Sequence, residues 1–123
     1  MKHVTIAESL ILEALWSRSP QTAEEIARQV GKEQKWTEAT VRTFLGRLVK
    51  KKAIAAKKDG RRFLYRPLIK RSDYLEHESR SLIDRLFDGR LAPLVTHFSA
   101  RRKLSAEDIA ELKQLLRKIE NDG

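Results

Sequence analysis

The pair Asp59-Gly60 limits the fold of this chain more than any other short stretch. It lies between two short apolar runs in the segment AIAAKKDGRRFLY, which spans residues 53–65. An Asp-Gly pair between apolar runs is the strongest short-range signal for a two-residue β-hairpin, because both central residues of a type I′ turn need a positive φ. The sequence therefore predicts one hairpin, with strands near residues 54–58 and 61–66.

The tip of this hairpin concentrates positive charge. A turn at Asp59-Gly60 places Lys58 opposite Arg61 and Lys57 opposite Arg62. Like charges that face each other across strands destabilise a sheet by on the order of tenths of a kcal/mol or more. A phosphate backbone along the hairpin would compensate for this repulsion through charge-assisted hydrogen bonds and released counterions, so all four cations are predicted to contact phosphates. The alternative is a hairpin edge whose charges prevent aggregation.

Three helices are predicted before the hairpin. Thr5–Glu8 and Thr22–Glu25 both have the capping-box form T-x-x-E and start helices over residues 6–17 and 23–30, the second ending at Gly31 as a C′ glycine. A third helix starts at Thr37, and its apolar residues recur at helical spacing and face the core. These residues are Val41, Phe44, Leu45, Leu48 and Val49. The fold class is therefore mostly α with a small β-hairpin, and the order of elements is that of a winged helix-turn-helix.

The outward side of the third helix is suited to contact with DNA bases. In helix-turn-helix proteins the second helix of the motif lies in the major groove, with its outward residues at base edges. Thr43 offers a hydroxyl and a methyl group, and the Arg47 guanidinium can bind guanine O6 and N7 together. The predicted base-reading residues are Ala39, Thr40, Thr43, Gly46 and Arg47. Arg42, Lys50 and Lys51 are predicted to contact phosphates, although lysines at a helix carboxy terminus also stabilise the helix dipole.

The positive charge is concentrated in the first half of the chain. The formal net charge is +9, and residues 1–68 hold 15 lysines and arginines against 7 acidic residues, whereas residues 69–123 hold 11 against 10. A cationic lobe beside a nearly neutral one indicates a polyanion-binding module with a second function next to it. The alternative is a surface that only keeps the protein soluble.

The composition excludes several kinds of chemistry. The chain has no cysteine, which excludes disulfides, thiolate metal sites and thiol catalysis. His3, His77 and His97 are far apart in the sequence, and the paired carboxylates fall in the first turns of predicted helices, where they stabilise the helix dipole. We therefore expect no enzyme activity, no metal and no cofactor. No stretch has the length of a signal core or a membrane span, so we expect a cytoplasmic protein without membrane insertion.

The second half of the chain is predicted to be helical and to form a dimer interface. A helix over residues 72–87 ends before Gly89, the segment LAPLVTHF follows, and Ser105 with Asp108 caps a last helix. The charge balance changes near the expected boundary between domains 1–69 and 70–123. Three short helices cannot bury all the apolar side chains of this region within one copy of the chain, so a partner chain is expected to cover them. The alternative is that these helices form a cap on the winged helix of the same chain. The predicted dimerisation residues are Leu75, Leu82, Ile83, Leu86, Phe87, Leu94, Phe98, Leu112, Leu115 and Leu116.

Five segments in order resemble one family of bacterial regulators. They are TVRTFLGRLVKKKAI, DGRRFLYRPLI, ESRSLIDRLFDG, LAPLVTHF and LSAEDIAELKQLL. Together they resemble the penicillinase repressor (BlaI/MecI/CopY) family over nearly the whole chain. The resemblance implies a homodimeric transcriptional repressor whose winged helix binds a pseudo-palindromic operator in double-stranded DNA. It also implies that the carboxy-terminal helices form the dimer.

The resemblance further implies how such a repressor is inactivated. In members that respond to β-lactams, a membrane sensor metalloprotease system leads to cleavage at an Asn-Phe bond before the last helix. His97-Phe98 stands at the corresponding place, where the phenylalanine matches and the asparagine does not. Copper-responsive members have a cysteine-rich tail, which this chain lacks, so a copper-thiolate switch is excluded.

Two other functions are compatible with a basic winged helix. A nonspecific or architectural nucleic-acid-binding protein would use the same cations without an operator. A protein-interaction adaptor would use its winged helix for protein contacts and would show no DNA binding that weakens steeply with salt.

Overall fold

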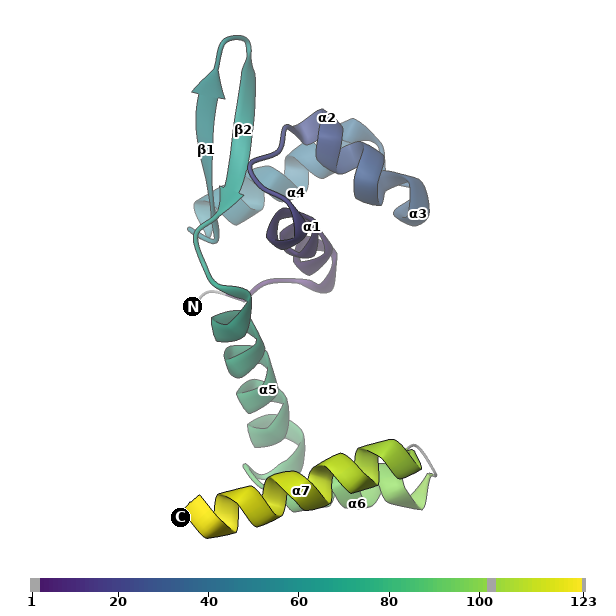
Figure 1. The fold of residues 1–123 in the computed structure, drawn as a ribbon. Coiled ribbons are helices and arrows are strands. Elements are labelled where there is room, and N and C mark those ends of the chain that lie inside the picture. The colour runs from purple at the N-terminus through teal and green to yellow at the C-terminus, as the bar shows by residue number, and fades with distance from the viewer. Residues whose placement is uncertain (1–2, 102–103, 123) are drawn as a thin grey trace. The chain divides into compact units, whose positions relative to one another are not determined.

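The computed structural model describes residues 3–101 and 104–122 of the chain (Figure 1). The chain forms two compact units, Met1–His77 and Glu78–Gly123. The first unit holds the elements α1 (Ile6–Ser17), α2 (Ala23–Ile26), the π-helical turn η1 (Ala27–Gly31), α3 (Lys32–Gln34), α4 (Glu38–Lys50), β1 (Ile54–Asp59) and β2 (Arg62–Pro67). This order of helices and one antiparallel hairpin is the winged helix-turn-helix that the sequence predicts.

The three predicted helix starts are confirmed by their caps. Thr5 and Thr22 each accept a hydrogen bond from the backbone N–H of a glutamate three residues on, and each glutamate carboxylate accepts from the cap backbone in return. Thr37 caps α4 by accepting from the N–H of Thr40 at 3.1 Å. These bonds satisfy donors that a helix start leaves free, so local sequence is sufficient to place each start.

The end of the second helix is where the sequence prediction is wrong. Gly31 has φ of −63°, and the chain passes through it in a π-helical turn and continues as α3 to Gln34. Lys35, with φ of 60°, is the left-handed residue that ends the helix. Glycine is needed at position 31 for a different reason, because a Cβ atom there would lie 2.9 Å from the carbonyl oxygen of Trp36.

The predicted register of the hairpin is also wrong, by one residue. The turn consists of Gly60 and Arg61, so Asp59 pairs with Arg62, Lys58 with Phe63 and Lys57 with Leu64. Gly60 has φ of 67° at the first central position, as in a type II′ turn, and this register spares Asp59 the positive φ of a type I′ turn. The like-charged pairs therefore do not form, and an ion pair of 3.3 Å joins Asp59 to Arg62 instead.

An isolated antiparallel β-bridge between Gln21 and Tyr65 joins the hairpin to the segment between α1 and α2. The N–H of Gln21 donates to the carbonyl of Tyr65 at 3.0 Å, and the N–H of Tyr65 donates back at 2.8 Å. The Gln21 side chain is buried and donates to the carbonyls of Ala14 and Arg18. The connection between α1 and α2 thereby fixes the base of the hairpin formed by β1 and β2, which is the wing of the winged helix.

The core of the first unit lies between α1, α2, α4 and the start of β1. Its largest fully buried apolar side chains are Ile11, Leu12, Leu15, Ile26, Val41, Leu45, Leu48 and Ile54. Of the predicted apolar stripe of α4, Phe44 is only half-buried and Val49 is 37% exposed. The prediction that Val49 faces the core is therefore wrong.

The first turns of α5 (Arg71–Phe87) belong to the first unit. The indole N–H of Trp16 donates to the carbonyl of Ile69 at 3.0 Å, and its ring lies 5.5 Å from that of Tyr74. Arg71 forms an ion pair of 3.1 Å with Glu13 of α1. These contacts join the start of α5 to α1, whereas the functional boundary at residues 69–70 stays a prediction.

The second unit consists of the rest of α5, α6 (Leu91–Ala100) and α7 (Ala106–Asp122). Asp88 and Gly89 end α5 with positive φ, and the N–H of Gly89 donates to the carbonyl of Ile83 at 3.0 Å. No described side chain of α5, α6 or α7 is fully buried, and Leu86, Leu115 and Leu116 are more than half exposed. In residues 3–101 and 104–122, no helix is both long and apolar enough to cross a bilayer.

Candidate nucleic-acid interface

The outward side of α4 presents most of the predicted base-reading residues to solvent. Ala39, Thr43, Gly46 and Arg47 are exposed, and apart from the neighbouring residues and backbone of α4 itself, no atom lies within 4 Å of the position where a Cβ on Gly46 would be. The Thr43 hydroxyl donates to the carbonyl of Ala39 at 3.1 Å, which leaves its methyl group and an oxygen lone pair for a base edge. Thr40 is half-buried, and its hydroxyl lies 3.1 Å from that of Thr37 in the cap.

The two arginines of α4 have different surroundings. Arg42 forms an ion pair of 3.4 Å with Glu38, one turn earlier on the same helix. Arg47 has no carboxylate partner among the described residues, and its guanidinium carbon lies 5.8 Å above the centre of the Phe44 ring. The donors of Arg47 are therefore free for a ligand, whereas Arg42 must share its charge with a neighbour.

Lys51 differs from the other cations near the end of α4. Its ammonium donates to Oε1 of Glu8 at 2.5 Å, and Glu8 is fully buried in α1. Burial works against the charged carboxylate, but the hydrogen bonds from Lys51 and from the Thr5 backbone outweigh it and lower the pKa of Glu8. Lys51 thus neutralises a buried charge inside its own domain, whereas Lys50 is exposed.

The wing brings three of the predicted phosphate contacts to one cleft. A hollow of about 210 Å³ is lined by Thr22, Ala23, Glu24, Arg42, Arg61, Arg62, Phe63 and Tyr65. Arg42 comes from α4 and the two other arginines from the hairpin, so the structure joins cations that the sequence places 19 or more residues apart. Lys57, Lys58 and Arg61 are exposed and have no carboxylate partner among the described residues.

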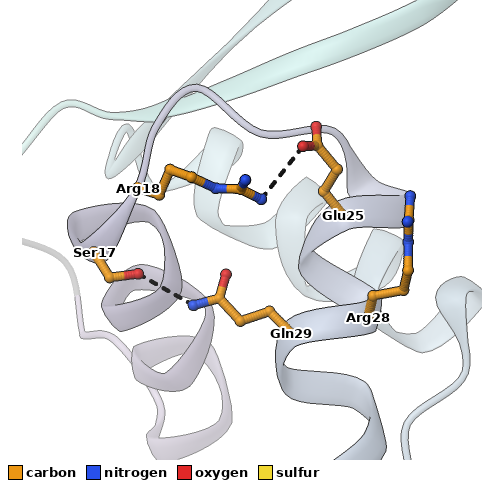
Figure 2. A pocket seen from close by; sticks show the side chains of 5 residues that line it. All are labelled: Ser17, Arg18, Glu25, Arg28 and Gln29. Atoms are coloured by element: carbon orange, nitrogen blue, oxygen red, sulfur yellow. Dashed lines mark hydrogen bonds and ion pairs between the residues drawn. The ribbon is translucent and has the colours of Figure 1, made fainter.

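A second hollow, of about 550 Å³, lies between α1 and α2 and is lined by Ser17, Arg18, Glu25, Arg28 and Gln29 (Figure 2). Arg18 pairs with Glu25 at 3.3 Å, and Gln29 donates to the Ser17 hydroxyl at 3.1 Å across the hollow. The Thr22 backbone and hydroxyl, which donate to Glu25, lower the pKa of its carboxyl group. Arg28 also has a carboxylate partner, Glu24, so this hollow offers no unpaired charge to a ligand.

The aromatic support under Arg47 is a feature that the sequence analysis missed. The rings of Trp36 and Phe44 lie 4.9 Å apart, and both pack against the core at its edge. The spacing of three residues between Phe44 and Arg47 was visible as a possible contact on one helix face. The part played by Trp36 was not, because it depends on how α3 ends.

The predicted cleavage site lies in a helix. His97 and Phe98 are exposed residues in the last turn of α6, with their rings 5.7 Å apart. His97 also lines an open hollow with Phe87, Arg90, Ala92, Pro93 and Thr96. A peptide bond in a helix must unwind before a protease can take it as an extended strand, and the ends of helices open most readily.

The fold, the cationic wing and the exposed side of α4 define a winged helix-turn-helix protein. The chain belongs to the penicillinase repressor family, whose family model matches residues 4–118. It is 36% identical over 118 residues to the penicillinase repressor of Bacillus licheniformis, which covers 96% of this chain and 92% of that protein. The methicillin resistance regulatory protein MecI of Mammaliicoccus sciuri is 30% identical over 115 residues, with 94% of each chain covered.

A solved structure of a relative agrees with this assignment. It is the solution structure of the monomeric form of Bacillus licheniformis BlaI in complex with the blaP half-operator. The two structures match with a TM-score of 0.52 and 34% sequence identity, over 59% of this chain and 89% of that one.

Proposed function

We propose that this chain is a sequence-specific transcriptional repressor that binds a double-stranded DNA operator. The observation that supports this most directly is the unpaired Arg47 on the exposed side of α4, in the same unit as the cationic wing. An arginine without a carboxylate partner can give two parallel N–H donors to guanine O6 and N7. The complex of a relative with its half-operator supports the choice of DNA as the ligand of this surface.

The proposed contacts follow the division between base and phosphate readout. Base contacts come from the predicted set on α4, namely Ala39, Thr40, Thr43, Gly46 and Arg47. Phosphate contacts come from Arg42, Lys50, Lys57, Lys58, Arg61 and Arg62. Lys51 is left out of this set, because a phosphate would have to compete with the buried Glu8 for its ammonium.

The experiment is selection from a pool of randomised duplexes, followed by gel shifts at several salt concentrations. We expect one sequence to be enriched and bound roughly 10³-fold or more tightly than random DNA at physiological salt. Equal affinity for all duplexes would instead identify a nonspecific or architectural protein. If the gel shifts detect no DNA binding that weakens as the salt concentration rises, a role in DNA binding is excluded.

The repressor is proposed to act as a homodimer on a pseudo-palindromic operator. The predicted dimerisation residues are Leu75, near the end of the first unit, and nine residues of the second unit. All of them are exposed or only half-buried in one copy of the chain, which leaves apolar surface for a partner chain to cover. Sedimentation at micromolar concentration measures this directly. A monomer that still binds a palindrome tightly would contradict the proposal.

Inactivation is proposed to proceed by proteolysis near His97-Phe98, downstream of a membrane sensor metalloprotease. The exposure of both side chains at the end of α6 supports access to this bond after local unwinding. In cells that contain the cognate sensor, Phe98→Ala should weaken induction. Unchanged induction in that variant would exclude this site.

A further inference from the structure

Arg47 rests on an aromatic ring of its own helix. Its guanidinium carbon lies 5.8 Å from the centre of the Phe44 ring, within the range in which a cation is attracted to a ring face. The contact uses none of the five N–H donors of arginine, so all of them remain available. By contrast, Arg42 and Arg62 each have an N–H group directed at a carboxylate.

The Phe44 ring packs against a second aromatic ring, that of Trp36. Trp36 lies 4.9 Å away, ring centre to ring centre, and its backbone N–H donates to the carbonyl of Gly31 at 2.8 Å. This close approach requires glycine at position 31, and the left-handed Lys35 turns the chain back to allow it. The end of α3 therefore determines where the ring beneath Arg47 lies.

We propose that Phe44, supported by Trp36, is a positioning residue that determines specificity for one base pair through Arg47. The inference rests on the proposed function, because it concerns how Arg47 binds a base edge. A free arginine side chain has many rotamers, and binding a guanine in two-donor geometry requires that all but a few be lost. A ring that already holds the guanidinium reduces this entropic loss for the correct base pair. A mismatched base pair offers no such geometry and gains nothing from it.

The test compares discrimination at individual base pairs, with a duplex that the wild-type chain selects from a randomised pool. Affinities are measured for this duplex and for every single base-pair substitution of it. Arg47→Ala first identifies the position that depends on Arg47, as the one where the preference is lost. Phe44→Leu, which keeps an apolar side chain but removes the ring, should then reduce discrimination by roughly two- to fivefold at that same position.

Two further variants separate positioning from folding. Phe44→Tyr keeps the ring face and should retain the preference at the Arg47 position. In the double variant Phe44→Leu with Arg47→Ala, removal of the ring should cause no additional loss, because Phe44 acts through Arg47. If Phe44→Tyr fails to fold, this double-variant comparison still decides the question.

Each remaining result contradicts the inference. Unchanged discrimination in Phe44→Leu would show that the ring does not influence Arg47 on DNA. An equal loss at every position would show a purely structural role for Phe44. If Arg47→Ala loses no preference at any position, Arg47 does not contact a base, although the chain can still be a repressor. If the pool yields no enriched sequence, the proposed function fails, and this inference fails with it.

Discussion

The ion pair between Glu8 and Lys51 should contribute measurably to the stability of the first unit. Glu8 Oε1 accepts hydrogen bonds from the Thr5 backbone at 2.9 Å and from the Lys51 ammonium at 2.5 Å. Glu8→Gln keeps the length of the side chain, and glutamine also serves as the third residue of a capping box. The substitution therefore removes the charge while leaving the start of α1 intact.

The expected loss is about 2 kcal/mol of unfolding free energy. A hydrogen bond to a charged group contributes roughly 1.5–3 kcal/mol. The Lys51 side chain is 23% exposed, so its ammonium can reach water, and the larger penalty of about 3–5 kcal/mol for a trapped charge does not apply. Glu8 Oε2 has no hydrogen-bond partner in the described part of the chain, which also keeps the net gain moderate.

Urea denaturation, monitored by circular dichroism, measures this loss. The midpoint of thermal unfolding of Glu8→Gln should lie roughly 10 °C below that of the wild type. The pKa of Glu8 is lowered in the folded protein, so its contribution is complete above the unfolded value of about 4.3 and is lost as the pH falls through the folded value. The difference between wild type and Glu8→Gln should therefore vanish in acid. Equal stability at neutral pH, or a difference that does not depend on pH, would refute this reasoning.

Two more predictions concern the wing and the glycines. Arg61→Ala should weaken binding to all duplexes about equally, because it removes a phosphate contact, and should reduce the slope of log affinity against log salt concentration by about one unit. Arg117→Ala in α7 is the matched control. An unchanged slope for Arg61→Ala would contradict the phosphate role. Gly31→Ala should lower the unfolding free energy by roughly 1–3 kcal/mol, because its Cβ would meet the Trp36 carbonyl oxygen at 2.9 Å. Gly46→Ala, whose Cβ would meet nothing within 4 Å beyond the neighbouring residues and backbone of its own helix, should instead raise stability by up to about 1 kcal/mol. Thermal melts of both variants measure these changes, and equal effects of the two substitutions would contradict the steric explanation.

The sequence by itself determined the order of elements and the side of α4 that faces outward. The threonine caps of α1, α2 and α4 bond to residues within four positions, so the signals for these helices are complete in the local sequence. The same is true of the hairpin, because its existence needs only a glycine between two short apolar runs. Net charge and family resemblance likewise require no coordinates.

Only the tertiary structure decided the features that no short sequence pattern encodes. Lys51 resembles any other lysine at a helix end until Glu8, 43 positions away, occupies its ammonium. Gly31 has the appearance of a helix stop, but its contact with Trp36 requires it for close packing. The turn at Gly60-Arg61 differs from the expected one because pairing along the whole hairpin, including Asp59 with Arg62, selects the register. Local preferences differ by fractions of a kcal/mol, and the packing and pairing of the folded chain are strong enough to overrule them.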